Sequence, residues 1–177
     1  KEFNSEVLVV SPINPIEEDI NTSNLPKIGT IAKIKVKMDL NNRTTRVVLE
    51  GKIRVNIVEY FIEEQSDMFR AKFENTTQFI LNAKDEVVLN RKIISEVERF
   101  ISRVPYMSNS IVGQLQQEKS ISKITDLVAN YLPSSFEKKL EYLKTVNPYN
   151  RVIMILESIK AEEEILQIEE KIEVELK

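Results

Sequence analysis

The chain has 177 residues, of which 42% are apolar and 30% are charged, and its formal net charge is −3. These values indicate an ordinary globular protein of one domain or two small subdomains, and they exclude a strong global field that would attract nucleic acid or membrane. Cysteine and histidine are both absent, which excludes disulfides, thiolate chemistry, zinc-protease motifs and a Ser-His-Asp triad. No apolar run approaches the roughly eighteen residues of a membrane span, and the lack of cysteine fits a reducing cytoplasm.

The first half of the chain carries strand patterns. Residues 7–10 form a short apolar run that ends at Ser11 and Pro12, and residues 45–50, 53–62 and 69–74 are further strand candidates. The clearest pattern is an alternation over residues 30–38 that predicts a half-buried strand with one apolar face and one lysine face. Its apolar face comprises Thr30, Ala32, Ile34, Val36 and Met38, and its lysine face comprises Lys33, Lys35 and Lys37.

Two features predict how these strands connect. Asn41 and Asn42 lie between the first two long strands, and because Asn tolerates a positive φ they favour a hairpin turn. Gly51 interrupts the next alternation, as at a bulge or a tight corner. If Gly51 has a positive φ, Gly51→Val should destabilise the sheet by about 1–3 kcal/mol. Short strands at close spacing predict a mostly antiparallel sheet that curls towards a barrel.

The second half changes to a helical period near Asp85. An apolar stripe from Val88 to Ile101 predicts a helix that Pro105 ends. Ser120 is an expected N-cap for a helix over residues 121–132, and Ser134 or Ser135 for one over residues 136–143. From Pro148 to Leu176 no helix breaker occurs, and a coiled-coil-like seam, a candidate for self-association, follows a 4-3-4 spacing. The seam comprises Ala161, Ile165, Ile168 and Ile172.

The sequence therefore predicts an α+β fold in two parts. Residues 1–84 form a curled, mostly antiparallel sheet of pseudo-barrel shape, and residues 85–177 form a helical bundle. The bundle ends in a long helix that begins at about residue 148.

Recognisable catalytic motifs are missing from this chain. The three glycines are too far apart for a dinucleotide fingerprint or a phosphate loop, and no serine lies in a glycine-flanked elbow. A Ser-Lys pair is not excluded by composition. Acidic clusters at residues 63–64, 162–164 and 169–170 could serve acid–base chemistry or bind a hard cation, although a solvated face is the simpler interpretation. We therefore predict no catalytic, cofactor-binding or metal-ligating residue here.

Two other sets of residues allow a functional interpretation. The lysine face could form a groove for a polyanion such as nucleic acid or polyphosphate, but a solvent-facing strand whose lysines discourage edge pairing is favoured. Aromatic residues gather in the strand-rich half, where core packing is the simpler interpretation and a groove for apolar stretches of unfolded chains is the alternative. These candidate substrate contacts are Tyr60, Phe61, Phe69, Phe73 and Phe79.

Several motifs follow one another in a characteristic order. They are EVLVVSP, the Ile28-Gly29-Thr30-Ile31-Ala32 core, VVLEGKIRV with its Glu50-Gly51 pair and Arg54, the Ala129-Asn130-Tyr131-Leu132-Pro133 break, and KKLEYL before the long acidic helix. In this order and spacing they resemble the amino-terminal domain of the Lon ATP-dependent proteases, and the resemblance covers nearly the whole chain. In that family an opening strand with a Pro-Leu-Arg-like motif and a helix precede this region, so the sheet is expected to lack its opening strand.

The resemblance implies that this chain binds other proteins and catalyses no reaction itself. Such a domain recognises misfolded and regulatory proteins as substrates and helps to assemble a ring, which is a hexamer in the family. An AAA+ ATPase that uses ATP and Mg²⁺ and a Ser-Lys serine peptidase are expected outside the chain, which would then be a fragment of a cytoplasmic quality-control protease without membrane contacts. The alternative is a free-standing Lon-domain binding protein with no protease attached. A phosphate loop encoded downstream of Lys177 would distinguish the two.

Overall fold

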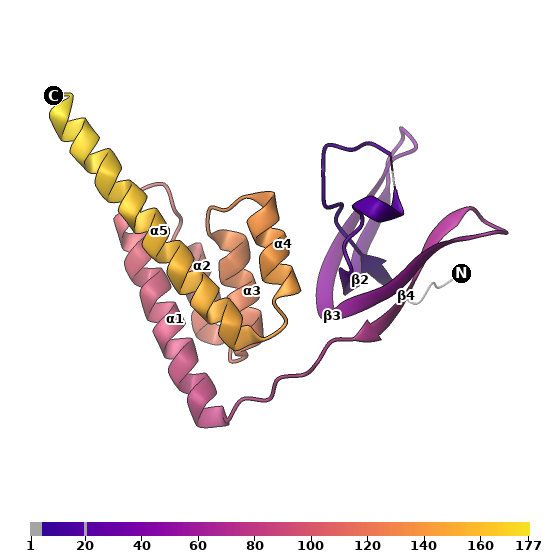
Figure 1. Cartoon of the computed structure of the whole chain (residues 1–177), viewed down its shortest axis with the longest axis horizontal. Coiled ribbons are helices and arrows are strands. Elements are labelled where there is room, and N and C mark those ends of the chain that lie inside the picture. The colour runs from indigo at the N-terminus through magenta and orange to yellow at the C-terminus, as the bar shows by residue number, and fades with distance from the viewer. Residues whose placement is uncertain (1–4, 20) are drawn as a thin grey trace. The chain divides into compact units, whose positions relative to one another are not determined.

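The computed structural model describes residues 5–19 and 21–177, and the chain divides into two compact units, Lys1–Thr77 and Gln78–Lys177 (Figure 1). The first unit is built on a β-sheet and the second is built from helices. The predicted α+β fold is therefore confirmed. The units meet at residues 77 and 78, whereas the division expected from the sequence was at residue 84.

The sheet has four antiparallel strands in the order β1-β2-β3-β4. They are β1 (Glu6–Val9), β2 (Ile28–Asp39), β3 (Thr45–Glu63) and β4 (Met68–Asn75). The two strand candidates on either side of Gly51 form the single 19-residue strand β3. Within the described residues β1 and β4 each pair with one neighbour, so the sheet does not close into a barrel.

A bulge lies next to Gly51, where the interrupted alternation predicts a bulge or a tight corner. Ala32 pairs with Gly51 and Ile31 with Ile53, so Lys52 is the extra residue of β3. None of the described glycines has a positive φ, so the condition under which Gly51→Val was expected to destabilise the sheet is not met. The bulge accommodates the extra residue through Lys52, which leaves Gly51 in ordinary extended backbone.

The β2–β3 turn also departs from the expectation. The residue with a positive φ is Arg43, at 61°, and neither Asn41 nor Asn42 adopts this conformation. The turn is closed by a hydrogen bond in which the Leu40 amide donates to the Thr44 carbonyl over 2.8 Å. The hairpin itself forms where the alternation predicts it.

Gly29 is the position at which the sheet requires a glycine. A Cβ atom there would lie 2.9 Å from Leu8 Cδ1, 3.0 Å from Val10 Cγ1 and 3.1 Å from the Val9 carbonyl oxygen. At Gly51 the nearest atom to such a Cβ would be Thr30 Cγ2, at 3.4 Å. The close approach of the β1 segment to β2 therefore depends on Gly29.

A polar contact orders the long loop between β1 and β2. Asn24, at the end of the short 3-10 turn Thr22–Asn24, is buried. Its Oδ1 accepts a hydrogen bond from the Asn14 amide at 2.8 Å, and its Nδ2 donates to the Asn14 carbonyl at 3.0 Å. The loop is thus closed on itself by one buried amide, which satisfies backbone groups that would otherwise be left without partners.

The second unit contains five helices. They are α1 (Ala83–Arg103), α2 (Ser110–Gln117), α3 (Ile121–Tyr131), α4 (Phe136–Lys144) and α5 (Pro148–Glu175). The predicted caps are confirmed, since the side chains of Ser120 and Ser135 accept hydrogen bonds from backbone amides in the first turns of α3 and α4. The short helix α2 is not predicted by the sequence pattern.

One apolar core holds the helical unit together. It draws on all five helices, with Tyr142 contributed by α4, and its most deeply buried members include Ile93, Val97, Phe100, Leu115, Ile124, Val128 and Ile155. The buried positions of α5 end at Ile159, and Leu166 is the last side chain of α5 that packs on the core. In Figure 1 the C-terminal part of α5 accordingly extends past the other helices of its unit. Among the described residues, no helix has the length and apolar character needed to cross a membrane.

A fully buried arginine lies at the centre of this unit. Arg151 of α5 has an exposed fraction of 0%. Its Nε donates to Thr125 Oγ1 at 3.0 Å, and Nη1 donates to the carbonyls of Thr145 and Val146 at 2.7 and 2.9 Å. Nη2 donates to Ser122 Oγ at 2.8 Å, and Asp126 Oδ1 lies 3.6 Å from Nε. One side chain therefore joins α3, the α4–α5 connection and α5.

Candidate functional site

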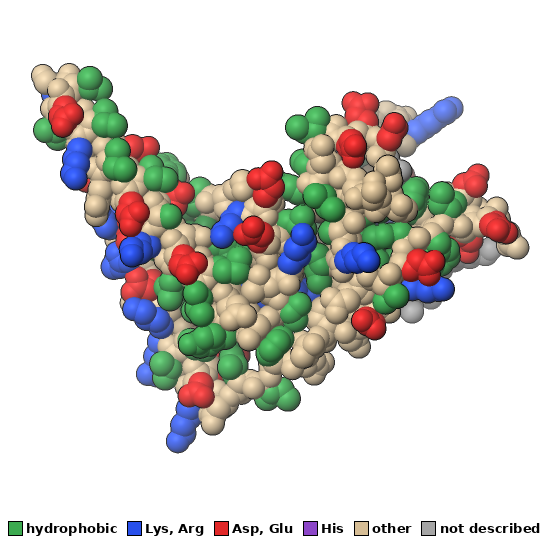
Figure 2. Space-filling model, in the orientation of Figure 1, with side chains coloured by type: hydrophobic (Ala, Val, Ile, Leu, Met, Phe, Trp, Pro, Cys, Tyr) green, Lys and Arg blue, Asp and Glu red, His purple; other side chains and the backbone are tan. Residues whose placement is uncertain are grey.

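Large apolar side chains gather on one face of the β3–β4 ladder. The register pairs Tyr60 with Ala71, Ile62 with Phe69 and Ile57 with Phe73, and directly paired residues lie on the same face. Ile57 is buried, whereas Ile62, Phe69 and Phe73 are 54%, 40% and 48% exposed. We call Tyr60, Ile62, Phe69, Ala71 and Phe73 the aromatic face. Figure 2 shows that hydrophobic side chains reach the surface in both units.

The opposite face of the same ladder is charged. Arg70 Nη2 lies 3.2 Å from Glu63 Oε2, and Lys72 Nζ lies 3.3 Å from Glu59 Oε2. Hydrogen bonds from the Ser66 hydroxyl and from Arg70 lower the pKa of Glu63. Phe61 lies on this face, paired with Arg70, and Lys72 Nζ is 5.9 Å from the centre of its ring. The structure thus separates Phe61 from the other aromatic candidates of the sheet.

Two further aromatic candidates have distinct surroundings. The Tyr60 hydroxyl donates a hydrogen bond to the Pro26 carbonyl, and burial raises the pKa of Tyr60. Tyr60 therefore secures the β1–β2 loop and leaves part of its ring for the aromatic face. Phe79 precedes α1 in the helical unit, is 45% exposed and has no place in the sheet. Of the five candidates, the structure brings together Tyr60, Phe69 and Phe73.

The predicted lysine face is wrong. Lys33 pairs with Glu50 and Lys37 with Val47, and since these partners are three residues apart on a regular stretch of β3 they lie on opposite faces. The cause is a second bulge, in which Lys35 is the extra residue of β2. Lys35 and Lys52 lie 2.8 and 3.0 Å from the Glu50 carboxylate, and their hydrogen bonds lower the pKa of Glu50 to about 2. A lysine row that could follow a polyanion does not form.

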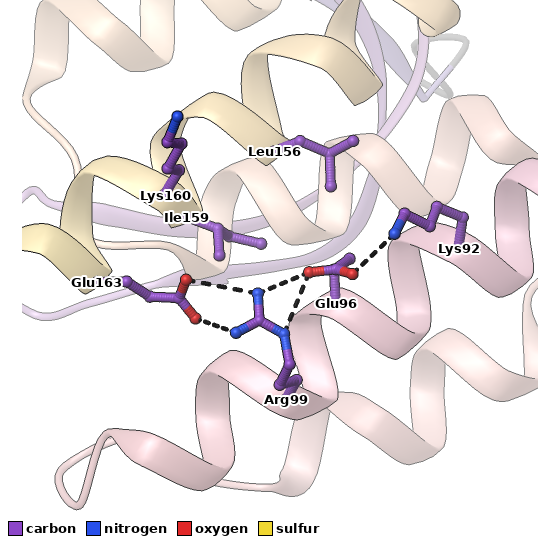
Figure 3. A pocket seen from close by; sticks show the side chains of 7 residues that line it. All are labelled: Lys92, Glu96, Arg99, Leu156, Ile159, Lys160 and Glu163. Atoms are coloured by element: carbon purple, nitrogen blue, oxygen red, sulfur yellow. Dashed lines mark hydrogen bonds and ion pairs between the residues drawn. The ribbon is translucent and has the colours of Figure 1, made fainter.

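A shallow groove of about 290 Å³ lies between α1 and α5. Its lining comprises Lys92, Glu96, Arg99, Leu156, Ile159, Lys160 and Glu163 (Figure 3). The Arg99 guanidinium bonds the carboxylates of Glu96 and Glu163, and Lys92 Nζ bonds Glu96 at 2.9 Å. These bonds, from Lys92 first and Arg99 second, lower the pKa of Glu96. The groove is therefore an ion-paired contact between α1 and α5, and this contact positions α5 on α1.

The predicted self-association seam lies on α5. Ile165, Ile168 and Ile172 are 48%, 56% and 48% exposed, and Ala161 is also exposed. Glu163 and Leu166, on the same helix, face the bundle instead: Glu163 pairs with Arg99, and Leu166 packs on the core. As for metals, the described residues hold no group of three or more acidic side chains arranged to bind one.

The family is shown by comparison with known proteins. The sequence profile of the family described as the ATP-dependent protease La (LON) substrate-binding domain matches residues 1–161. The chain belongs to this family. Lon protease of Bacillus thuringiensis is 30% identical over 159 residues, which are 90% of this chain and 19% of that protein. Lon protease of Rhizobium meliloti is 27% identical over 172 residues, which are 97% of this chain and 21% of that protein. The chain thus spans about a fifth of these relatives.

A solved structure shows the same fold. The N-terminal domain of a Mycobacterium avium complex Lon protease superposes with a TM-score of 0.64, over 87% of this chain and 90% of that chain, at 14% identity. The expected resemblance to the amino-terminal domain of Lon proteases is therefore confirmed.

Sequence reasoning missed part of the site in this Lon substrate-binding domain. Ile62 and Ala71 belong to the aromatic face, and their alternation with Phe61 and with Arg70 and Lys72 was a signal that could have assigned them. No sequence pattern could have predicted the ion pair of Arg99 with Glu163, because the two residues are 64 positions apart in the sequence.

Proposed function

We propose that this Lon substrate-binding domain holds exposed apolar segments of unfolded or degron-bearing proteins on its aromatic face. The observation that carries the proposal is the exposure of Ile62, Phe69 and Phe73 on one face of a short ladder, at 54%, 40% and 48%. Contiguous exposed apolar side chains mark interaction sites in proteins that are otherwise polar at the surface. Unfolded chains are the partners that present such apolar segments.

The size of the aromatic face favours weak binding. Each of its three most exposed side chains is already about half covered, so complete burial would contribute on the order of 1 kcal/mol apiece. Association costs several kcal/mol in lost translational and rotational freedom. Together these contacts contribute about 3 kcal/mol, which does not exceed that cost, so apolar contact alone gives weak binding with fast release. Weak binding suits a domain that passes substrates on without altering them.

We further propose that the chain is part of a complete Lon-type protease. The relatives that match along nearly the whole chain are named Lon protease, and the chain spans about a fifth of them. The remaining part would supply the AAA+ module with ATP and Mg²⁺ and the Ser-Lys peptidase. The enzyme would be a cytoplasmic homohexamer for protein quality control, and the α5 seam would contribute to its self-association. A coding sequence with no phosphate loop after Lys177 would favour the free-standing binding protein.

The aromatic face can be tested with a matched control on the opposite face. We expect Phe69→Ser combined with Phe73→Ser to weaken binding of fluorescein-labelled unfolded casein at least tenfold in fluorescence anisotropy. Phe61→Ser removes an aromatic ring from the charged face of the same ladder, and binding should stay within about twofold. Circular dichroism would verify that both variants are folded. Equal losses in the two variants, or no loss in the double variant, would contradict the proposed site.

A further inference from the structure

The strand β4 forms a long edge of the sheet. The strand order places it outermost, and β3 is its one partner in the part of the chain that the structure describes. It has eight residues, contains no proline, and pairs regularly on its own side, because the extra residue of the β3–β4 bulge is Val58 of β3. A strand edge presents a row of N–H and C=O groups that only another extended backbone can match residue by residue.

The aromatic face continues to this edge. Phe69, Ala71 and Phe73 are residues of β4 itself, so a strand added alongside would place every second side chain next to them. The edge at β1 offers less, since that strand has four residues. Backbone pairing and apolar contact would therefore combine at β4, in the mode by which several peptide-binding domains add a strand to a sheet.

The charges of β4 indicate which strand can be added. On the charged face β4 contributes Met68, Arg70, Lys72 and Glu74. The two cations lie at the middle of the strand, and their partners Glu63 and Glu59 lie one strand further in. An added strand would lie directly beside the two cations, where like charges are unfavourable and acidic or uncharged residues are favourable. Antiparallel pairing of β4 with a second copy about Ala71 would set Arg70 opposite Lys72 twice, which disfavours a dimer in that register.

We propose that β4 binds an extended polypeptide segment as an added strand, in which apolar residues alternate with acidic or uncharged ones. The inference rests on the proposed function, and it names the substrate class and the binding mode of the same site. Because backbone hydrogen bonds are independent of side-chain identity, this mode accepts many sequences, and the aromatic face and the two cations select among them.

N-methylated peptides separate backbone pairing from apolar contact. The probe is a fluorescein-labelled octapeptide that alternates Ile and Glu, with a matched octapeptide that alternates Ile and Lys. In an added strand the amides of alternate residues point to β4 and the others point to solvent. N-methylation of one alternate set should therefore weaken binding at least tenfold, and N-methylation of the other set should leave it within about threefold. The Ile/Lys peptide should bind at least fivefold more weakly than the Ile/Glu peptide.

Hydrogen exchange gives an independent measurement. On addition of the Ile/Glu peptide, alternate amides within residues 68–75 should gain protection. Equal binding by both N-methylated peptides would overturn the inference while leaving the proposed function intact, provided that casein binding still depends on Phe69 and Phe73. Protection of β4 that rises with protein concentration alone would overturn it in favour of a second copy. If casein binding does not depend on Phe69 and Phe73, the proposed function itself is contradicted.

Discussion

Replacement of Arg151 tests the account of the helical core. The side chain is completely buried and donates hydrogen bonds to Thr125, to Ser122 and to two backbone carbonyls. Arg151→Met keeps a long apolar side chain but removes every one of these donors. Each buried acceptor left without a donor costs about 1–3 kcal/mol, and breaking a buried charged network typically costs about 3–5 kcal/mol. We expect the free energy of unfolding to fall by about 3–5 kcal/mol.

The assay is urea unfolding followed by circular dichroism at 222 nm, which reports on the helices. Arg103→Met is the matched control, because this arginine of α1 is 39% exposed in its side chain and lies 3.6 Å from Glu163. An exposed ion pair contributes about 0–1 kcal/mol, so the control should unfold close to wild type. Arg151→Lys keeps the charge but loses the planar geometry, so its free energy of unfolding should lie between those of Arg151→Met and Arg103→Met.

One result would refute this reasoning. If the free energy of unfolding of Arg151→Met lies within about 1 kcal/mol of the wild-type value, the neighbouring carbonyls find other partners and the arginine does not hold α3 and α5 together. The desolvation of the buried guanidinium would then offset its hydrogen bonds, as happens in some buried ion pairs.

Three further predictions concern the sheet, acid stability and self-association. Gly29→Ala should destabilise the sheet by about 1–3 kcal/mol, because its Cβ would lie 3.1 Å from the Val9 carbonyl oxygen. Gly51→Ala, which meets one side-chain atom at 3.4 Å, is the control and should change the urea midpoint little. The pKa of Glu50 is lowered to about 2 and those of Glu63, Glu96 and Glu118 are also lowered. Since their folded pKa values lie below the unfolded value near 4.5, their stabilisation is complete above about pH 5 and is lost as the pH falls towards 2. Urea midpoints that rise on acidification below pH 4.5 would contradict this. Ile165→Glu with Ile168→Glu should abolish any concentration-dependent oligomer in sedimentation, whereas a wild-type chain that stays monomeric at high concentration would show that the α5 seam does not self-associate.

Hydrophobic periodicity and helix caps predicted most of the fold. The alternation over residues 30–38 and 69–74 identified β2 and β4, and Ser120, Ser135 and Pro148 marked helix starts that the structure reproduces. These signals are local, since each depends on a strand period, a cap or a ring constraint within a few residues.

What the sequence could not predict depends on neighbours that are distant in the chain. A bulge is visible only once two strands are paired, so Lys33 and Lys37 were expected on the same face and lie on opposite ones. The requirement for glycine at Gly29 arises from the β1 segment, and the environment of Arg151 is made by α3. An arginine near the start of a helix usually predicts a solvated side chain, because charged residues are seldom fully buried.

The two units use apolar residues in different ways, and this difference supports the assignment of binding to the sheet. In the helical unit one core collects buried residues from all five helices, and the buried Arg151 joins α3, α5 and the α4–α5 connection. In the described part of the sheet unit the buried apolar side chains are Pro26, Ile28, Ala32, Val55 and Ile57, while Ile62, Phe69 and Phe73 remain exposed. Backbone pairing therefore contributes a larger share of the sheet's stability. Side chains that the sheet does not need for its own core are free to contact a partner, and regions with few buried contacts are those that open most readily. Binding of an extended segment at β4 would add backbone hydrogen bonds at the edge of the sheet and would cover Phe69 and Phe73 at the same time.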